Sequence, residues 1–273
     1  MNILVTGSNG QLGSEIKDLV TNYKDFNFFF RDLPELNICD AEALNTFVFN
    51  QNINAVINSA AYTAVDQAEE DVVIAEQVNE KGVLNLTNAL EKVDGKLIHI
   101  STDYVFDGNN FLPYKESDPV SPIGVYGKTK RAGELAVINS DIDSIVIRTS
   151  WLYSAFGNNF VKTMLKLGHE RDELGVIFDQ VGTPTNASDL AKTCLDILLD
   201  KSSANISKKG KIYHYSNEGV TSWYDFATAI MEFGSLDCKV RPIETKDYPT
   251  PAKRPHYSVL NKSKIKIDFN IQI

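Results

Sequence analysis

Three glycines near the start of the chain constrain its fold more than any other feature. Gly7, Gly10 and Gly13 follow the β-branched and aliphatic run Asn2–Thr6, and an amphipathic stretch that continues to Val20 comes directly after them. This order predicts a strand, a glycine turn and a helix. Glycine permits positive φ and a close approach of pyrophosphate, and a helix N-terminus offers unpaired N–H groups. The motif therefore indicates a dinucleotide site; the simpler alternative is a tight turn without a ligand.

Four further strand-like runs, at residues 26–30, 55–58, 96–101 and 144–148, are separated by segments of helical length. Strands that alternate with helices predict parallel βαβ units with right-handed crossovers. Residues 97–100 are mainly apolar with little alternation, which is typical of a sheet covered on both faces. We therefore predict an α/β fold: a doubly wound, Rossmann-like parallel sheet with a smaller, interwoven C-terminal substrate domain.

No linker rich in proline or serine divides the chain, so a second domain has to be interwoven with the first. We predict a dinucleotide-binding domain over residues 1–150, with return segments from about 175–215, and a mainly substrate-binding region over 151–273. Within that region, residues 158–171 and 187–200 have a helical pattern and 179–185 a loop pattern. Four prolines, from Pro242 to Pro255, break the C-terminal part of the chain into short pieces.

Composition excludes several classes of protein. The net charge of −9 argues against general nucleic-acid binding. No apolar run approaches the roughly 18 residues of a membrane span, and the first residues lack a signal-peptide pattern, so we expect a cytoplasmic protein without membrane contact. Three widely spaced cysteines fit neither a disulfide framework nor a zinc site, and we expect buried thiols. Residues 239–273 hold eight Lys or Arg against three Asp or Glu, which suits a small anionic ligand or a solvated surface.

Two segments bear on the choice of cofactor. Asp32 lies nineteen residues beyond Gly13, where a carboxylate can accept hydrogen bonds from adenosine ribose hydroxyls, whereas the adjacent Arg31 suits a 2′-phosphate. NAD and NADP therefore both remain open. After the run at 55–58, the small residues up to Thr63 would let a ribose or the nicotinamide side lie close to the backbone; alone, they are only a strand ending in small residues.

Tyr126 and Lys130 are four residues apart, so at the start of a helix they share one face. A nearby ammonium favours the phenolate, and we expect it to lower the pKa of Tyr126 toward neutral pH and create a proton donor. Thr102 ends a predicted strand, at the sheet edge where doubly wound folds bind ligands. A tyrosine and a lysine at this spacing also occur together by chance in many proteins.

Taken together and in order, the motifs resemble those of one family. They are Gly7-x-x-Gly10-Gln11-Leu12-Gly13, Thr102-Asp103-Tyr104-Val105-Phe106-Asp107-Gly108, Tyr126-Gly127-x-x-Lys130-x-x-Gly133-Glu134, Arg148-Thr149-Ser150-Trp151-x-Tyr153, Asp179-Gln180-x-Gly182-x-Pro184-Thr185, Gly219-x-x-Ser222-Trp223-Tyr224-x-Phe226 and Arg254-Pro255-x-x-Ser258-Val259-Leu260. The chain closely resembles the dTDP-4-dehydrorhamnose reductases, which are extended short-chain dehydrogenases/reductases. The resemblance covers nearly the whole chain.

This resemblance implies an enzyme that transfers a hydride from NADPH or NADH to the C4 ketone of dTDP-4-dehydro-L-rhamnose, giving dTDP-L-rhamnose for cell-surface polysaccharide. It implies that Tyr126 protonates the ketone oxygen, that Lys130 tunes Tyr126 and holds the nicotinamide ribose, and that Thr102 polarises the ketone. The implied cofactor contacts are Gly7, Gly10, Gln11, Leu12, Gly13, Asp32, Asn37, Ile38, Ala60, Ala61, Tyr62, Thr63, Tyr126 and Lys130. The implied substrate contacts are Thr102, Asp103, Trp151, Asn159, Gln180 and Arg254; for Trp151, a core aromatic is a serious alternative.

Two departures from the family pattern limit these inferences. Asn37 stands where relatives often carry Asp, which weakens a cofactor assignment based on charge. Some members are dimers bridged by magnesium; a homodimer is thus an option here, but Glu15 alone does not indicate a metal.

Two other functions stay open. A non-catalytic relative could bind the dinucleotide as a regulatory subunit, although Thr102, Tyr126 and Lys130 favour the enzyme. An epimerase or dehydratase acting on a nucleotide sugar would retain its cofactor through the cycle, so stoichiometric consumption of NADPH separates it from a reductase.

Overall fold

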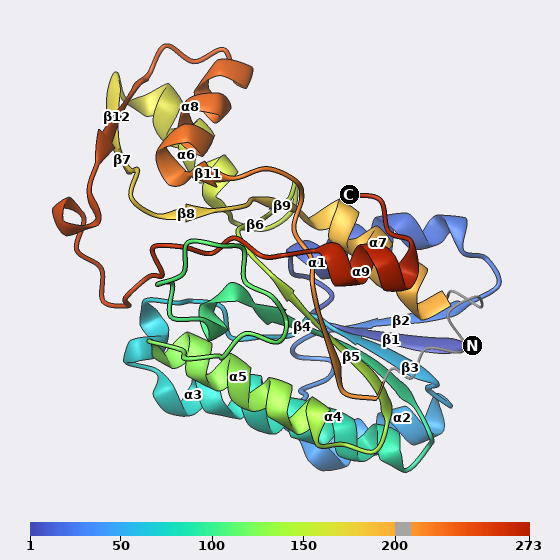
Figure 1. Ribbon diagram of the computed structural model, residues 1–273. Coiled ribbons are helices and arrows are strands. Elements are labelled where there is room, and N and C mark those ends of the chain that lie inside the picture. Colours follow the sequence, from blue (N-terminus) through green and yellow to red (C-terminus); the bar gives the residue numbers. More distant parts are fainter. Residues whose placement is uncertain (200–208) are drawn as a thin grey trace.

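The computed structural model describes residues 1–199 and 209–273, and a six-stranded parallel sheet lies at its centre (Figure 1). The strand order is β10-β5-β4-β3-β1-β2. These strands are β1 (Asn2–Thr6), β2 (Asn27–Arg31), β3 (Ala55–Asn58), β4 (Lys96–Thr102), β5 (Asp143–Thr149) and β10 (Lys211–His214). The order reverses next to β1, as in a doubly wound sheet, so the predicted fold class is confirmed.

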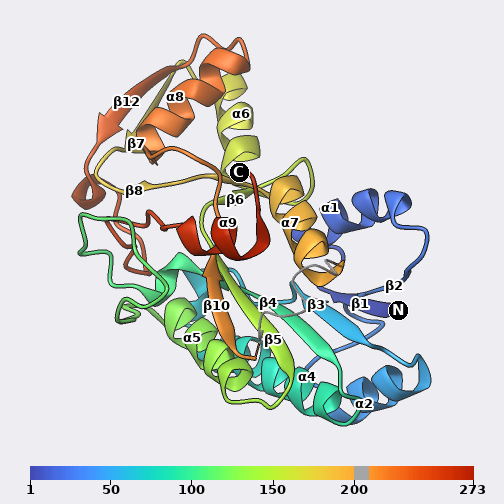
Figure 2. The same cartoon turned by 45° about the vertical axis from the view of Figure 1, so that its right-hand side comes forward.

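Helices cover both faces of this sheet (Figures 1 and 2). On one face lie α2 (Ala41–Asn50), α3 (Val72–Glu76), α4 (Gly82–Glu91) and α5 (Val125–Ile138), and on the other α1 (Gln11–Leu19), α7 (Ala187–Leu199) and α9 (Ser263–Phe269). The short helical turns are η1 (Val20–Asn22), η2 (Gln67–Glu69), the π-helical η3 (Gln77–Lys81), η4 (Asp103–Val105) and η6 (Thr245–Asp247).

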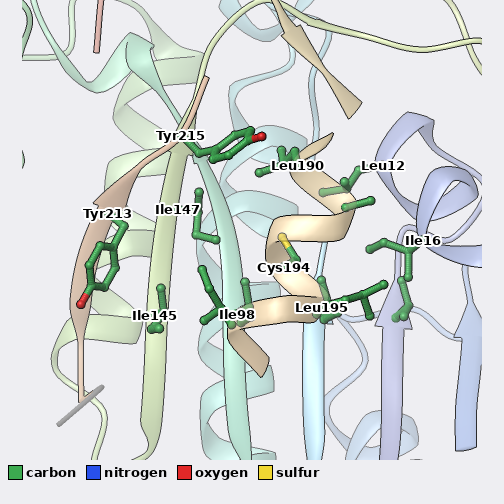
Figure 3. Close-up of a cluster of buried hydrophobic side chains, with 14 of the residues drawn as sticks. Leu12, Ile16, Ile98, Ile145, Ile147, Leu190, Cys194, Leu195, Tyr213 and Tyr215 are labelled. Atoms are coloured by element: carbon green, nitrogen blue, oxygen red, sulfur yellow. The ribbon is translucent and has the colours of Figure 1, made fainter. Parts of the chain in front are cut away.

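Alternation along β1 divides the core into two halves. Ile3 and Val5 pack against α1 and α7 in the cluster drawn in Figure 3, whereas Leu4 packs on the other side with Leu44 of α2 and Leu86 of α4. All five side chains are fully buried. Both faces of the strand are therefore apolar, which is the physical reason for its unbroken hydrophobic sequence.

A smaller lobe stands above the carboxyl edge of the sheet (Figure 1). It contains α6 (Phe160–Glu170), β7 (Glu173–Ile177), α8 (Trp223–Phe233) and β12 (Lys239–Ile243), and β7 pairs with β12 in parallel. Its separate core is built around Met164, Val176 and Met231. Short pairs connect it to the sheet: β6 (Leu152–Tyr153) with β9 (Thr185–Asn186), and β8 (Val181–Gly182) with β11 (Thr221–Ser222).

The chain enters this lobe more than once. After β5 it runs into α6 and β7, returns to the sheet through α7 and β10, and then enters the lobe again at α8 and β12. The predicted division into domains at residue 150 stays a prediction. The predicted helix at 187–200 corresponds to α7, although Asp200 lies outside the described residues.

Strands β7, β10 and β12 are not predicted from the sequence, and residues 179–185 include the short strand β8. Cys194 and Cys238 are buried and Cys39 is partly buried, and all three are free thiols. Among the described residues, no helix has the length and apolar character needed to cross a membrane. The cytoplasmic location stays a prediction.

Candidate active site

A cavity of about 980 Å³ opens at the carboxyl ends of β1, β3, β4 and β5. This edge of a doubly wound sheet is the place where ligands bind in such folds. Most of the predicted site residues line the cavity: Gly7, Gly10, Gln11, Leu12, Asp32, Asn37, Ile38, Ala60, Ala61, Tyr62, Thr63, Thr102, Asp103, Tyr126, Lys130 and Trp151. Gly13, Asn159, Gln180 and Arg254 are not among the lining residues.

The glycine turn is shaped by close backbone contacts. Gly7 has φ +64°, and a Cβ there would lie 2.6 Å from Ala60 N; a Cβ on Gly13 would lie 2.5 Å from Gly7 O. These two glycines are therefore required by packing between β1, α1 and the loop after β3. A Cβ on Gly10 would meet only Gly7 O, at 3.2 Å, so this position is less crowded than the other two.

The N-terminus of α1 fits an anionic group. Gly10 is its N-cap, and no side chain in the described part of the protein caps this helix. Gln11 and Leu12, in the first turn, line the cavity. The first N–H groups of a helix are good donors to phosphate and lie at the positive end of the helix dipole. The residues present thus suit a dinucleotide pyrophosphate.

Asp32 lies at the end of β2 and lines the cavity. Its carboxylate accepts hydrogen bonds from Asn9 N at 2.9 Å and from Leu33 N at 2.9 Å, so it is held against the glycine turn. Arg31 points elsewhere: it donates to Phe30 O, and its guanidinium lies 5.1 Å from the centre of the Phe47 ring. Of these two neighbouring residues, Asp32 lines the cavity and Arg31 does not.

The wall after β3 is held by two buried asparagines. Asn58 Oδ1 accepts from Thr6 Oγ1 at 2.6 Å and from Ala60 N at 3.2 Å. Asn79, in the π-helical turn η3, accepts from Tyr62 N at 2.9 Å and donates to Tyr62 O at 3.1 Å. Asn79 is not predicted from the sequence, because no local pattern shows that a π-turn will bring its side chain to a distant loop.

Thr102, Tyr126 and Lys130 come from neighbouring elements. Thr102 is the last residue of β4, and α5 begins with Val125, one residue before Tyr126. Lys130 is buried one turn further along and donates from Nζ to Ile100 O at 2.7 Å. Tyr126 also packs edge-on against Tyr104, with ring centres 5.4 Å apart. The structure therefore brings the three predicted catalytic residues to one end of the cavity.

The prediction that Lys130 lowers the pKa of Tyr126 is wrong for the structure described. Desolvation raises the pKa of Tyr126 to about 12, a hydrogen bond with Thr102 opposes this rise, and the charge of Asp103 adds to it. Desolvation also lowers the pKa of Lys130 to about 8, against the stabilising charge of Glu134. The ammonium is directed to Ile100 O, and burial outweighs charge for both groups.

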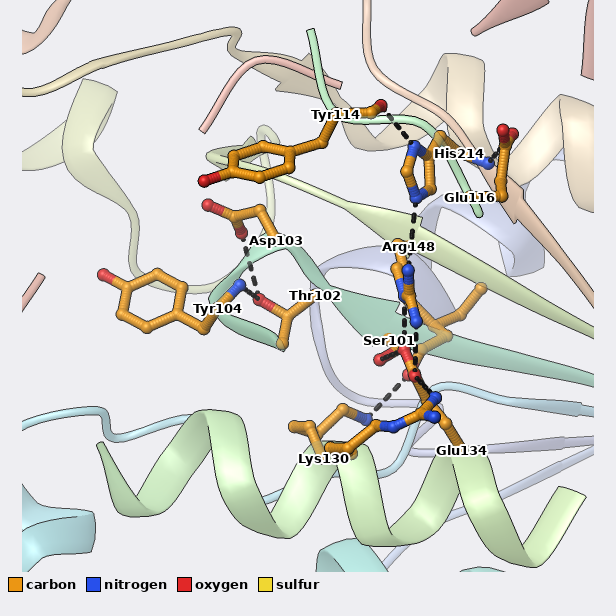
Figure 4. A network of polar contacts seen from close by, with 12 residues as sticks. Ser101, Thr102, Asp103, Tyr104, Tyr114, Glu116, Lys130, Glu134, Arg148 and His214 are labelled. Carbon is orange, nitrogen blue, oxygen red and sulfur yellow. Dashed lines mark hydrogen bonds and ion pairs between the residues drawn. The ribbon is translucent and has the colours of Figure 1, made fainter. Parts of the chain in front are cut away.

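A buried ionic network lies behind Lys130 (Figure 4). Glu134 accepts from Arg148 Nε at 2.7 Å and from Arg148 Nη2 at 2.8 Å, and also from Ser101 Oγ at 2.7 Å and Arg131 Nη1 at 2.7 Å. These bonds, above all those from Arg148, keep the pKa of Glu134 below its ordinary value despite burial. Glu134 stands in the motif that contains Tyr126 and Lys130, but its partner on β5 is visible only in the fold.

Asp103 follows Thr102 and is 3% exposed. Its Oδ1 accepts from Thr102 Oγ1 at 3.0 Å, whereas the buried Oδ2 has no well-formed hydrogen bond among the described residues. Desolvation raises the pKa of Asp103 to about 6, and the hydroxyl groups of Ser258 and Thr102 oppose that rise. A buried carboxyl group that titrates near neutral pH and faces a cavity is typical of a functional site.

Trp151 belongs to an aromatic group that joins the sheet to the lobe. Its backbone has φ +49°, and its ring stacks on Trp223 of α8 with centroids 3.5 Å apart. Phe160 of α6 lies 4.6 Å from Trp223, and all three rings line the cavity. In the sequence Trp223 is visible only as part of a motif, because its stacking on Trp151 is a tertiary contact.

Three predicted substrate contacts are engaged elsewhere. Asn159 caps α6 by accepting from Lys162 N, and its Nδ2 donates to Gln11 Oε1 at 3.0 Å. Buried Gln180 donates to Thr245 Oγ1 at 3.1 Å. Arg254 forms a bidentate ion pair with Asp66, at 3.0 and 2.6 Å, which neutralises the charge that a phosphate would need.

Glu15 accepts from Ser154 Oγ at 2.6 Å, so this carboxylate links α1 to the segment before α6. Within residues 1–199 and 209–273, the structure holds no cluster of acidic, histidine or cysteine side chains that would bind a metal ion.

Comparisons with known proteins identify the family of this chain. The family model described as "RmlD substrate binding domain" matches residues 1–273. A dTDP-4-dehydrorhamnose reductase of Aggregatibacter actinomycetemcomitans is 41% identical, over 99% of this chain and 94% of its own length. The spore coat polysaccharide biosynthesis protein SpsK of Bacillus subtilis is 40% identical, over 95% of this chain and 88% of its own length.

Solved structures are similar over the same span. The crystal structure of a dTDP-4-dehydrorhamnose reductase from Clostridium acetobutylicum has a TM-score of 0.92 and 43% identity, covering 98% of this chain and 92% of its own. The Bacillus anthracis dTDP-4-dehydrorhamnose reductase, solved in complex with NADP, has a TM-score of 0.92 and 36% identity with the same coverage. The chain therefore belongs to the dTDP-4-dehydrorhamnose reductase family.

Proposed function

We propose that this protein is an NAD(P)H-dependent reductase of the C4 ketone of dTDP-4-dehydro-L-rhamnose, which yields dTDP-L-rhamnose. The observation that carries the proposal is the meeting of Thr102, Tyr126 and Lys130 in one cavity with the uncapped N-terminus of α1. The product suits the assembly of rhamnose-containing cell-surface polysaccharide.

NAD(P)H, when bound, supplies the hydride. The N–H groups at the start of α1 hold its pyrophosphate, and Asp32 accepts from the adenosine ribose hydroxyls. Lys130 lines the same cavity, and its ammonium can donate to the nicotinamide ribose and stabilise negative charge. The segment 60–63, held by Asn58 and Asn79, keeps one wall of the cavity in place.

Proton transfer is the task of Tyr126. Because burial raises the pKa of Tyr126 to about 12, the phenol is protonated at neutral pH and can donate to the oxygen that accepts negative charge during reduction. The Thr102 hydroxyl can donate to the same oxygen and stabilise the transition state. Trp151 and Trp223 form an apolar wall for the sugar nucleotide.

A coupled assay tests this function. Purified protein is mixed with NADPH or NADH and with enzymatically prepared dTDP-4-dehydro-L-rhamnose, and absorbance at the reduced-nicotinamide band is followed. We expect one cofactor to be consumed for each product formed, and none without the sugar nucleotide. Turnover of a nucleotide sugar without net cofactor consumption would identify an epimerase or a dehydratase instead.

We also propose that two copies associate as a homodimer. Val73 of α3, Leu84 of α4 and Leu135 of α5 are 64, 45 and 42% exposed, on helices that cover one face of the sheet (Figure 1). An exposed apolar face of this kind is typical of a subunit interface.

Sedimentation equilibrium tests the homodimer. The natural sequence should give twice the chain mass, and the double variant Leu84→Glu with Leu135→Glu should give a monomer. A monomeric natural protein would contradict the proposal.

A further inference from the structure

The start of α5 is capped by a side chain from another part of the chain. Its N-cap is Gly124, which has no side chain that could accept hydrogen bonds from the first turn. Glu69, the last residue of η2, takes this role: its Oε1 accepts from Val125 N at 2.8 Å in a partly buried contact. The first N–H groups of a helix need such acceptors, and a carboxylate is favoured at the positive end of the helix dipole. Glu69 therefore closes the N-terminus of α5.

Gly124 leaves the room that this carboxylate occupies. A Cβ on Gly124 would lie 2.7 Å from Glu69 Oε1, and apart from the chain neighbours of Gly124 no other described residue comes within 4 Å of that position. The backbone of Gly124 has φ −115° and ψ 171°, an extended conformation that any residue can adopt. Glycine is therefore needed here to make space for Glu69, and not for its backbone freedom.

The same turn of α5 is also held against η4. A Cβ on Gly127 would lie 2.2 Å from Tyr104 O, so the two backbones approach closely, and the ring of Tyr104 packs edge-on against that of Tyr126. The segment that carries Glu69 is anchored as well, because the adjacent Ala68 is fully buried. Tyr126 thus stands in the first turn of a helix whose start is fastened to two other segments.

We propose that Glu69 is a positioning residue for the reductase reaction: by capping α5, it holds the Tyr126 phenol where the proton has to be delivered. The inference rests on the proposed function, because it needs Tyr126 as the proton donor. Neither Glu69 nor Gly124 is predicted from the sequence as a site residue, and neither lines the cavity. Glu69 therefore acts through the helix that carries Tyr126, and not by contact with a ligand.

The place of Tyr126 in the helix makes the reaction sensitive to this cap. Helix ends fray, and Tyr126 is the second residue of α5. A misplacement of about 1 Å can lower a rate by about 100-fold. Lys130, one turn further along, has its own contact with Ile100 O, and the glycine turn precedes another helix, α1. Loss of the cap should therefore lower kcat and leave cofactor binding intact.

Two substitutions at Glu69 separate the cap from the charge. Glu69→Ala removes the acceptor, and we expect kcat to fall about tenfold, with the KM for the cofactor within about twofold of the natural value. Glu69→Gln keeps an oxygen that can accept from Val125 N, so its kcat should stay within about threefold of the natural value. The proposal is overturned by an unchanged kcat in Glu69→Ala, by a KM that rises as much as kcat falls, or by equal losses in both variants.

Gly124→Ala tests the same contact from the other partner. The new Cβ would displace the flexible end of Glu69, so this variant should lose about as much kcat as Glu69→Ala does. When the carboxylate is already absent, there is room for the methyl group. The double variant Glu69→Ala with Gly124→Ala should therefore be no slower than Glu69→Ala alone. Losses that add up would show that the two residues act separately and would contradict the proposal.

Val137→Ala is the matched control for stability. Val137 is fully buried near the other end of α5 and does not line the cavity, so its truncation lowers the free energy of unfolding without touching the cap. Its kcat should equal that of the natural protein under conditions where both are folded. A fall as large as in Glu69→Ala would mean that destabilisation, and not the position of Tyr126, explains the loss.

Hydrogen exchange follows the cap without any turnover. The Val125 amide should exchange several-fold faster in Glu69→Ala than in the natural protein, and Glu69→Gln should restore the slow rate. Equal exchange in all three proteins would refute the cap. If the cap were seen in this way but the natural protein consumed no NAD(P)H with dTDP-4-dehydro-L-rhamnose, the proposed function would be refuted, and with it the role of the cap in catalysis.

Discussion

At the scale of single residues, the site depends on where the side chains of Tyr126 and Lys130 keep their protons. Tyr126 is protonated at neutral pH because burial raises its pKa by more than the nearby hydroxyl of Thr102 lowers it. The ammonium of Lys130 donates to Ile100 O.

We expect Tyr126→Phe to lower kcat by about 10²–10⁴-fold, with little change in cofactor affinity, because only the proton donor is lost. Lys130→Ala should damage both kcat and cofactor binding. Equal turnover in Tyr126→Phe and the natural protein would remove Tyr126 from proton transfer.

Lys130 also makes stability depend on pH. Its pKa is about 8 in the folded protein against an ordinary 10.5, so between these values the unfolded chain binds more protons and the free energy of unfolding rises with pH. Between pH 8 and 10.5, the natural protein should gain on the order of 3 kcal/mol relative to Lys130→Met. Urea unfolding of both proteins at several pH values measures the difference, and a difference that does not change with pH would contradict the account.

Asp32 bears on the choice of cofactor. Its carboxylate lines the cavity and would repel a 2′-phosphate, whereas Arg31 is stacked on Phe47. We expect Asp32→Ser to raise kcat/KM for NADPH relative to NADH by about tenfold, because like-charge repulsion is removed. The ratio of the two kcat/KM values in the variant and the natural protein is the measurement; a ratio that moves toward NADH would place the adenosine ribose elsewhere.

At the scale of secondary-structure elements, Asn159 joins the start of α6 to α1. Its Oδ1 caps the helix and its Nδ2 reaches Gln11. Asn159→Ala should reduce the free energy of unfolding by about 1 kcal/mol, because the cap is lost. Asn159→Ser is the matched control: serine caps a helix about as well but is too short to reach Gln11. Equal loss in the two variants would mean that the bond to Gln11, and not the cap, determines the effect.

The pair formed by Glu134 and Arg148 fixes α5 against β5, and with it the position of Lys130. Arg148→Met would leave the fully buried Glu134 carboxylate with Arg131 as its one cationic partner among the described residues, so we expect a loss of about 3–5 kcal/mol in the free energy of unfolding. Adding Glu134→Leu should recover part of that loss, because no unpaired charge then remains. Chemical denaturation of the single and double variants measures both effects; no recovery would indicate that packing dominates.

At the scale of the whole molecule, the lobe is held to the sheet by aromatic stacking and by the bond from Asn159 to Gln11. The chain has two tryptophans, and they stack on each other across this junction. We expect an exciton-type signal in the circular dichroism that vanishes in Trp223→Phe. On heating, it should disappear together with the helical signal if lobe and sheet unfold as one unit. Earlier loss of the tryptophan signal would show that the lobe separates first.

Local sequence determined the repeated strands, the glycine turn and the helix that carries Tyr126 and Lys130, because apolar periodicity and glycine act over a few residues. Thr102, Tyr126 and Lys130 could be named from motifs and family resemblance. Packing, in contrast, decided that Arg254 pairs with Asp66, that Asn159 reaches Gln11, and that Tyr126 keeps its proton. These outcomes depend on groups far apart in the chain and on how deeply each charge is buried, which no local pattern contains.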